Sequence, residues 1–219
     1  MGEQLRVAVI GVGYLGRFHA LIYSHLPQVR LVGVVDADAA RASAVAKEAG
    51  CAAFTDLAAI IDQVDAVSVV VPTTAHLAVA EPLLSRGIHL LLEKPIAATR
   101  GEGERIVALA DQAGAILQIG HLERFNAGVM ALAEHIDRPR FVETQRLGEF
   151  VERATDVDVV SDLMIHDLDI ILSLMGSELR SVSAVGTPVL TDQVDIANAR
   201  LEFANGAVAN AVASRVSDR

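Results

Sequence analysis

The first 120 residues alternate short apolar runs with segments of helical spacing, and this alternation constrains the fold more than any other feature. Strands that are apolar on both faces need cover on both sides, which helices between parallel strands provide. Pro82 predicts a kink or a break in one of the helices. We expect strands at 5–13, 29–36, 52–55, 65–72, 88–95 and 115–121, and helices at 14–26, 38–50, 57–64, 75–87 and 100–114.

The rhythm changes after His121, where the pattern predicts an α+β region with an open, largely antiparallel sheet. Asn205-Gly206 between the last two expected strands is a strong hairpin signal. The 219 residues therefore divide into expected domains 1–120 and 121–219. In the second domain we expect helices at 122–136 and 161–176, and strands at 140–153, 179–189, 196–205 and 207–217.

The chain stops directly after its last expected strand, with no closing element. A sheet that ended there would leave an exposed edge. We therefore expect the second domain to be incomplete and the chain to be a fragment that lacks its last strands.

Charge and cysteine content exclude several classes of protein. A formal net charge of −10 argues against nucleic acid or an anionic membrane as a partner, because either needs a basic face. Cys51 is the sole cysteine, so one chain can form neither a disulfide nor a cysteine metal cluster, as is typical of a reducing compartment. Export-signal and membrane-span patterns are absent, and we expect a soluble, cytoplasmic protein.

A glycine turn follows the first expected strand and opens a helix. Gly11, Gly13 and Gly16 have the spacing of a dinucleotide-binding turn, with Tyr14 and Leu15 at the start of the helix. The helix N-terminus offers N–H donors and a favourable dipole to a pyrophosphate. The order of strand, glycines, helix, strand and acid predicts a Rossmann domain more strongly than the glycines alone, which also occur in purely structural turns.

Asp36 ends the second expected strand, 20 residues after Gly16. A carboxylate there accepts from the ribose 2′-hydroxyl and repels a 2′-phosphate. The sequence thus predicts NAD as the cofactor rather than NADP, although Arg41 and its loop could accommodate a phosphate.

Together these features resemble the Gfo/Idh/MocA oxidoreductases, and the resemblance covers essentially the whole chain. Members have an N-terminal Rossmann domain and a C-terminal α/β domain whose open sheet often forms oligomer contacts, which implies a homo-oligomer, dimer or tetramer, at full length. Members are usually longer than this chain. The segments that carry the resemblance are GVGYLGRFHA (11–20), VVPTTAHLAVA (70–80), LEKPIA (92–97), GHLERFN (120–126) and DLMIHDLD (162–169).

Within the family, the segments 120–126 and 156–169 look most like the nucleotide-sugar members, such as UDP-N-acetylglucosamine 3-dehydrogenases. One departure is Ala127, where that group commonly has proline.

Lys94 lies just past the end of a parallel strand, where open α/β sheets bind their ligands. Its charge can polarise a reacting hydroxyl, Glu93 can orient or neutralise it, and Pro95 fixes the turn. The residues alone also fit a surface turn with a solvated ion pair. The resemblance implies that Lys94 is catalytic and is compatible with a cis Lys94–Pro95 bond.

Asp162, His166 and Asp169 fall at i, i+4 and i+7 on an otherwise apolar helix, with no Lys or Arg between 154 and 179. Such a stripe of acids and a histidine indicates that this side of the helix faces a cleft rather than an ordinary solvent-exposed surface. The resemblance implies that His166 accepts the alcohol proton, and that Asp162 acts on Lys94 and holds substrate, in a cleft between the two domains. Asp167 and Asp169 could be structural.

The resemblance also supplies the remaining site residues. Arg124 and Asn126 are candidate substrate contacts together with His166, although Arg124 also fits a surface ion pair with Glu123 or near Glu134. We expect no metal site, since the histidines lack ligand spacing, and no role for His19, His25, His89 or His135. The implied cofactor contacts are Gly11, Gly13, Tyr14, Leu15, Gly16, Asp36, Pro72, Thr73, His76, Glu93 and Lys94.

Three functions compete. The first is an NAD-dependent dehydrogenase acting on the 3-hydroxyl of a UDP-linked amino sugar. The second keeps the chemistry but oxidises a polyol, inositol or simple sugar. The third is a non-catalytic, NAD-binding regulatory protein, against which the presence of Lys94, Asp162 and His166 argues.

Overall fold

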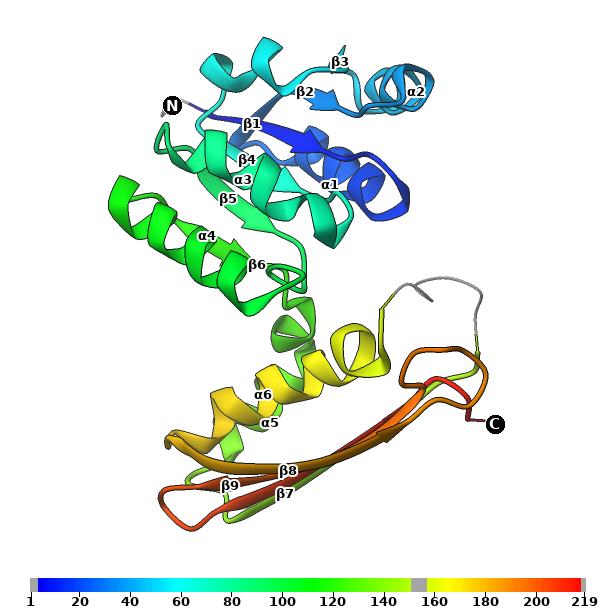
Figure 1. The fold of residues 1–219 in the computed structure, drawn as a ribbon. Coiled ribbons are helices and arrows are strands. Elements are labelled where there is room, and N and C mark those ends of the chain that lie inside the picture. Colours follow the sequence, from blue (N-terminus) through cyan, green and yellow to red (C-terminus); the bar gives the residue numbers. More distant parts are fainter. Residues whose placement is uncertain (1–3, 151–156, 218–219) are drawn as a thin grey trace. The chain divides into compact units, whose positions relative to one another are not determined.

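The computed structural model describes residues 4–150 and 157–217, and the chain folds into two compact units, Met1–Gly120 and His121–Arg219. Each unit has its own apolar core. Figure 1 traces both along the chain.

The first unit contains a fully parallel sheet in the order β3-β2-β1-β4-β5-β6. This is the strand order of a doubly wound dinucleotide-binding domain, with its reversal between β1 and β4. The predicted Rossmann fold is confirmed. Its strands are β1 (Leu5–Ile10), β2 (Val29–Val35), β3 (Ala52–Phe54), β4 (Ala66–Val69), β5 (His89–Leu92) and β6 (Leu117–Ile119).

Helices cover both faces of this sheet, as the doubly apolar strands require (Figure 1). The helices α1 (Tyr14–His25) and α2 (Ala39–Ala49) pack on one face, around Val9 and Val34. The helices α3 (His76–Leu84) and α4 (Arg100–Ala113) pack on the other, around Leu83 and Ile106.

One local expectation for this unit is wrong. The helix expected at 57–64 is a pair of 3₁₀ turns, Leu57–Ala59 and Ile61–Gln63, because Ile60 between them adopts φ −119° and interrupts a continuous helix. Pro82 lies inside α3, which continues to Leu84, so the helix is not broken there. A 3₁₀ turn, Thr73–Ala75, precedes α3.

The second unit contains a mixed sheet in the order β7-β10-β9-β8. One face of this sheet packs on α6, around Leu201 and Phe203 (Figure 1). The elements are a 3₁₀ turn (Leu122–Phe125), α5 (Ala127–His135), β7 (Phe141–Leu147), a π-helix (Val160–Met164), α6 (Ile165–Met175), β8 (Leu179–Thr187), β9 (Ile196–Phe203) and β10 (Val208–Ser214).

The sheet is largely antiparallel, as predicted, but its last strand is not an edge. β10 pairs antiparallel with β9 through the predicted hairpin, where the Phe203 N–H donates to the Ala207 carbonyl at 2.9 Å and Gly206 adopts φ +81°. On its other side β10 pairs parallel with β7. The end of the strand expected at 140–153 lies outside the described residues, since β7 ends at Leu147 and 151–153 are not described.

Within the described parts of both units, no helix is long and apolar enough to cross a membrane.

Candidate functional site

The glycine turn between β1 and α1 combines two tightly packed glycines with one open glycine. A Cβ at Gly11, which adopts φ +82°, would lie 2.7 Å from the Val70 carbonyl oxygen. A Cβ at Gly16 would lie 1.9 Å from the Gly11 oxygen, whereas a Cβ at Gly13 would meet no heavy atom within 4 Å. Gly11 and Gly16 are therefore needed to build the turn, and Gly13, at the N-cap of α1, leaves its outer side open to a phosphate.

Asp36 links this turn to the end of β2. Its carboxylate accepts from the Val12 and Asp38 N–H groups, each at 2.9 Å. A carboxylate has about four acceptor sites, so both oxygens can still accept from ribose hydroxyls. The open glycine turn offers space for the pyrophosphate of NAD, and Asp36, held by two backbone N–H groups, offers acceptors for its ribose.

Arg41 is engaged by the chain's own acids. Its guanidinium lies 3.2 Å from Asp38 and 3.9 Å from Asp36. The Arg41 backbone N–H and guanidinium lower the pKa of Asp38, which caps α2. A 2′-phosphate would have to compete with two carboxylates for Arg41, and this favours NAD over NADP.

The loops that follow β4 and β5 are tied together by His76. Its ring is buried, with Nδ1 at 3.2 Å from the Ile96 carbonyl oxygen and Nε2 at 3.1 Å from that of Val71. His76 therefore supports the loops, while Pro72 is exposed and Thr73 is half-buried beside it.

Glu93 and Lys94 leave the end of β5 beside the β4 loop. The Glu93 N–H donates to the Val69 carbonyl at 3.1 Å, and the Lys94–Pro95 bond is cis. The Glu93 side chain is only 10% exposed, so the alternative of a solvated surface ion pair does not fit. This turn lies at the carboxyl edge of the parallel sheet, the edge at which open α/β sheets bind their ligands.

The helix that carries Asp162 and His166 begins with a π-turn. The Ile165 N–H reaches the Val160 carbonyl, five residues back. The expected i, i+4, i+7 stripe assumed 3.6 residues per turn throughout, and the wider turn changes this register. Single π-turns within helices occur frequently at functional sites.

Asp167 and Asp169 are both paired with arginines from distant segments. Arg146 on β7 donates twice to Asp167, at 2.9 Å each, and Arg124 donates twice to Asp169. These carboxylates raise the pKa values of their arginines. The sequence showed no local cation, but cations come from 21 and 45 residues away.

The two predicted substrate contacts also have partners within their own unit. Arg124 is paired with Asp169, rather than with Glu123 or the Glu134 region, and stays half-exposed. Asn126 caps α5 by accepting from the Gly128 N–H at 2.9 Å. Any contact with substrate would be additional to these structural bonds.

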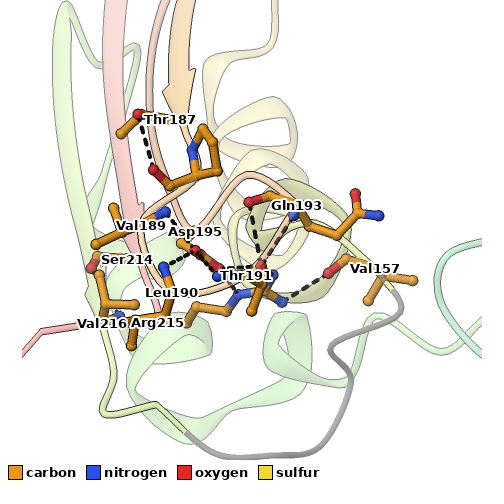
Figure 2. A network of polar contacts seen from close by, with 11 residues as sticks. Val157, Thr187, Val189, Leu190, Thr191, Gln193, Asp195, Ser214, Arg215 and Val216 are labelled. Carbon is orange, nitrogen blue, oxygen red and sulfur yellow. Dashed lines mark hydrogen bonds and ion pairs between the residues drawn. The ribbon is translucent and has the colours of Figure 1, made fainter.

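A buried ion pair anchors the segment that leads into the site helix (Figure 2). Arg215 donates from Nε to Asp195 at 2.7 Å and from Nη1 to the Val157 carbonyl at 2.8 Å. The Val159 N–H donates to the Val194 carbonyl at 2.9 Å. The loop that holds Asp195 therefore fixes the chain just before Asp162.

The charge of Asp195 is strongly stabilised. Burial alone would raise its pKa, but the N–H groups of Thr191 and Val189 and the Arg215 guanidinium hold that pKa far below its ordinary value. Nothing in the sequence pattern pointed to Asp195 or Arg215, because they contact each other only after β9 and β10 have paired.

Two family models match the chain. A model described as "Oxidoreductase family, NAD-binding Rossmann fold" matches residues 5–121, and the "GFO/IDH/MocA C-terminal domain" model matches residues 128–219. The chain belongs to the Gfo/Idh/MocA family. It is therefore a dehydrogenase that uses a nicotinamide cofactor on CH–OH groups, with an NAD-binding Rossmann domain.

Similar proteins include UDP-N-acetylglucosamine 3-dehydrogenase of Acidithiobacillus ferrooxidans, 45% identical over 214 residues that span 97% of this chain and 68% of that protein. The crystal structure of that enzyme, GnnA, superposes with a TM-score of 0.94 at 43% identity, over 100% of this chain and 72% of that chain. The scyllo-inositol 2-dehydrogenase (NAD(+)) of Bacillus subtilis is 31% identical, over 99% of this chain and 69% of its own length. GenD2 from gentamicin A biosynthesis, solved with NAD, has a TM-score of 0.92 at 25% identity, over 100% of this chain and 68% of its own.

Proposed function

We propose that this chain oxidises the 3-hydroxyl of a UDP-linked amino sugar with NAD. The observation that carries this proposal is the 45% identity, over 97% of the chain, to a protein named UDP-N-acetylglucosamine 3-dehydrogenase. The described units support it with an open glycine turn beside Asp36, a buried Glu93 next to Lys94, and a π-turn that carries Asp162.

Oxidising a secondary alcohol removes a hydride from carbon and a proton from oxygen. NAD, when bound, supplies the hydride acceptor. In the proposed mechanism His166 accepts the hydroxyl proton as a general base. Lys94 places its positive charge against the oxygen, where negative charge develops, and Asp162 acts on Lys94 and holds the sugar.

Arg124 and Asn126 are the proposed contacts for the rest of the substrate. A guanidinium is suited to phosphate oxygens, and that of Arg124 is half-exposed although it is paired with Asp169. Asp169 fixes the direction of the Arg124 side chain, which reduces the entropy lost when a diphosphate binds.

We also propose a homo-oligomer that forms through the sheet face opposite α6. Alternation along β7 puts Phe141 and Leu147 on this face, and the strand register adds Val185, with exposures of 58%, 56% and 70%. Exposed apolar side chains on a sheet face favour association, and here Glu143, Gln145 and Arg200 lie between them on the same face. Light scattering on wild type and on Phe141→Lys tests this, because a monomer in both would contradict the proposal.

The inositol dehydrogenase at 31% identity keeps a polyol as the second candidate substrate. Absorbance of NADH, followed separately with UDP-N-acetylglucosamine and with myo- or scyllo-inositol, discriminates the two. We expect turnover with the nucleotide sugar. Turnover with an inositol alone would replace the proposed substrate, and binding of NAD without turnover of any of them would support the regulatory alternative.

The role of Lys94 can be tested cleanly because the chain has only two lysines, Lys47 and Lys94. We expect Lys94→Ala to lower kcat by about 10² to 10⁴-fold, the usual contribution of a positioned catalytic group. NADH affinity should change little. Lys47→Ala, in the last turn of α2, is the matched control and should turn over like wild type.

A further inference from the structure

A chain of polar side chains runs through the first unit to Glu93. The Tyr23 hydroxyl lies 2.7 Å from Ser68 Oγ, and Ser68 Oγ lies 3.1 Å from His19 Nδ1. His19 Nε2 lies 3.5 Å from Glu93 Oε1. Ser68 is fully buried on β4, and the side chains of His19 and Glu93 are 12% and 10% exposed. These four groups connect α1 and β4 with the residue beside Lys94.

The chemistry of these groups fixes the His19 proton that faces Glu93. A bare lone pair on Nε2 would face a carboxylate oxygen, which is repulsive, so Nε2 carries a proton. With the proton on Nε2, Nδ1 can accept from the Ser68 hydroxyl, and Ser68 Oγ can accept from the Tyr23 hydroxyl. In this arrangement the Nε2–H faces Glu93 Oε1 across 3.5 Å, a separation at which the pair forms no hydrogen bond, and Oε1 is buried without a hydrogen-bond partner among the described residues.

Glu93 needs such a partner because its carboxylate is confined. A Cβ at Gly120 would lie 2.8 Å from Glu93 Oε1, so the glycine leaves only enough room for the carboxylate. A buried carboxylate without a donor or a positive partner is strongly destabilised. Among the described contacts, His19 Nε2 lies 3.5 Å from Oε1 and can present a donor to it.

We propose that His19 is a positioning residue: its Nε2–H group attracts the Glu93 carboxylate across 3.5 Å and thereby fixes the backbone that presents Lys94. This inference rests on the proposed catalytic role of Lys94. The sequence assigned no function to His19, because its partners Ser68 and Glu93 are 49 and 74 positions away and come together only when β4 and β5 pair.

Two amide substitutions separate the two ring nitrogens. Glutamine places its amide nitrogen where Nε2 lies, and asparagine places its amide where Nδ1 lies. We expect His19→Gln to keep kcat within about threefold of wild type and His19→Asn to lose about tenfold or more, with KM for NAD nearly unchanged in both. Equal kcat values in the two variants would overturn the proposal.

A readout without substrate comes from the two lysines. Reductive methylation with ¹³C-formaldehyde labels Lys47, Lys94 and the terminal amine, so the Lys94 methyl resonance is resolved. We expect this resonance to move in His19→Asn and to return in His19→Gln, while the Lys47 resonance stays in place. An unmoved Lys94 resonance in His19→Asn would overturn the positioning role.

Three further variants complete the test. His25→Asn changes an exposed histidine on the same helix and should leave both readouts at wild type. Ser68→Ala, which keeps the imidazole but removes its donor, should shift the Lys94 resonance if His19→Asn does not fold. Lys94→Ala separates the two proposals. An active Lys94→Ala variant would contradict the catalytic role of Lys94. An inactive Lys94→Ala variant beside a fully active His19→Asn variant would contradict only the positioning role of His19.

Discussion

At the scale of single residues, the glycine turn shows that glycines in one motif serve different physical purposes. Gly16 is required because the backbone of Gly11 occupies the space of its missing Cβ. Gly13 has open space on that side, so a methyl group there would conflict with a ligand and not with the protein.

This difference predicts opposite outcomes for two alanine substitutions. Gly13→Ala should keep the melting temperature within about 3 °C of wild type and weaken NADH binding by about tenfold or more. Gly16→Ala should lower the melting temperature by about 10 °C or prevent folding, because its Cβ would lie 1.9 Å from a carbonyl oxygen. Thermal unfolding and NADH fluorescence titration check both, and a stable, tightly binding Gly13→Ala would contradict this interpretation.

The glycine turn and Asp36 were predictable from the sequence because strand, turn and helix follow each other locally. The partner of Asp169 was not, since Arg124 is 45 residues away and on another element. His19 was missed for the same reason. Spacing identifies residues on one element, but not which distant side chain folding brings to them.

At the scale of elements, α6 is held by two aspartate–arginine pairs in different surroundings. The Asp167–Arg146 pair joins the helix to β7, and its arginine is 31% exposed. In the Asp169–Arg124 pair the arginine is 48% exposed, whereas the two carboxylates are buried alike, at 11% and 10%. A lost partner is therefore more costly for Arg146, which cannot turn as freely to water.

We expect Asp167→Asn to lower the free energy of unfolding by about 2 kcal/mol, and Asp169→Asn by less than about 1 kcal/mol. Urea denaturation of the two variants measures the difference directly. Equal losses of unfolding free energy in the two variants would mean that the different exposure of the two arginines does not change the cost of removing their partners.

Asp195 makes the loop between β8 and β9 sensitive to acid. Its folded pKa is depressed, so its stabilising effect is complete above the unfolded value of about 3.9 and is lost progressively as the pH falls below that value. Asp195→Asn lacks this effect at every pH. The melting-temperature gap between wild type and Asp195→Asn should thus be largest near pH 7 and shrink from pH 4 to pH 3.

The control for this experiment is Asp192→Asn, an exposed acid in the same loop, which should show no gap at any pH. A gap for Asp195→Asn that stays constant down to pH 3 would contradict the role assigned to its charge.

Element types were largely predictable, because alternation and helical spacing are properties of short segments. The π-turn at Val160–Met164 was not, since the same apolar pattern fits an uninterrupted α-helix. The parallel pairing of β10 with β7 was also not predictable from the sequence, because α6, β8 and β9 lie between these two strands in the chain.

At the scale of the whole molecule, the described residues form separate apolar clusters that can be assigned unit by unit. Two core clusters draw only on the first unit, and the third draws only on the second. A unit with its own core can fold alone. We expect the fragment 1–120 to unfold cooperatively and to bind NADH, as followed by circular dichroism and fluorescence; a fragment without a cooperative transition would contradict this.

The place of β10 inside the second sheet affects the order in which the protein is made. The first unit has all its strands once β6 has been synthesised, whereas β7 and β9 gain their shared neighbour only when Ser214 has left the ribosome. Domains fold as units during synthesis, N-terminal first. The nascent chain therefore carries a complete parallel sheet while β7 remains unpaired along its β10 side until β10 has been synthesised.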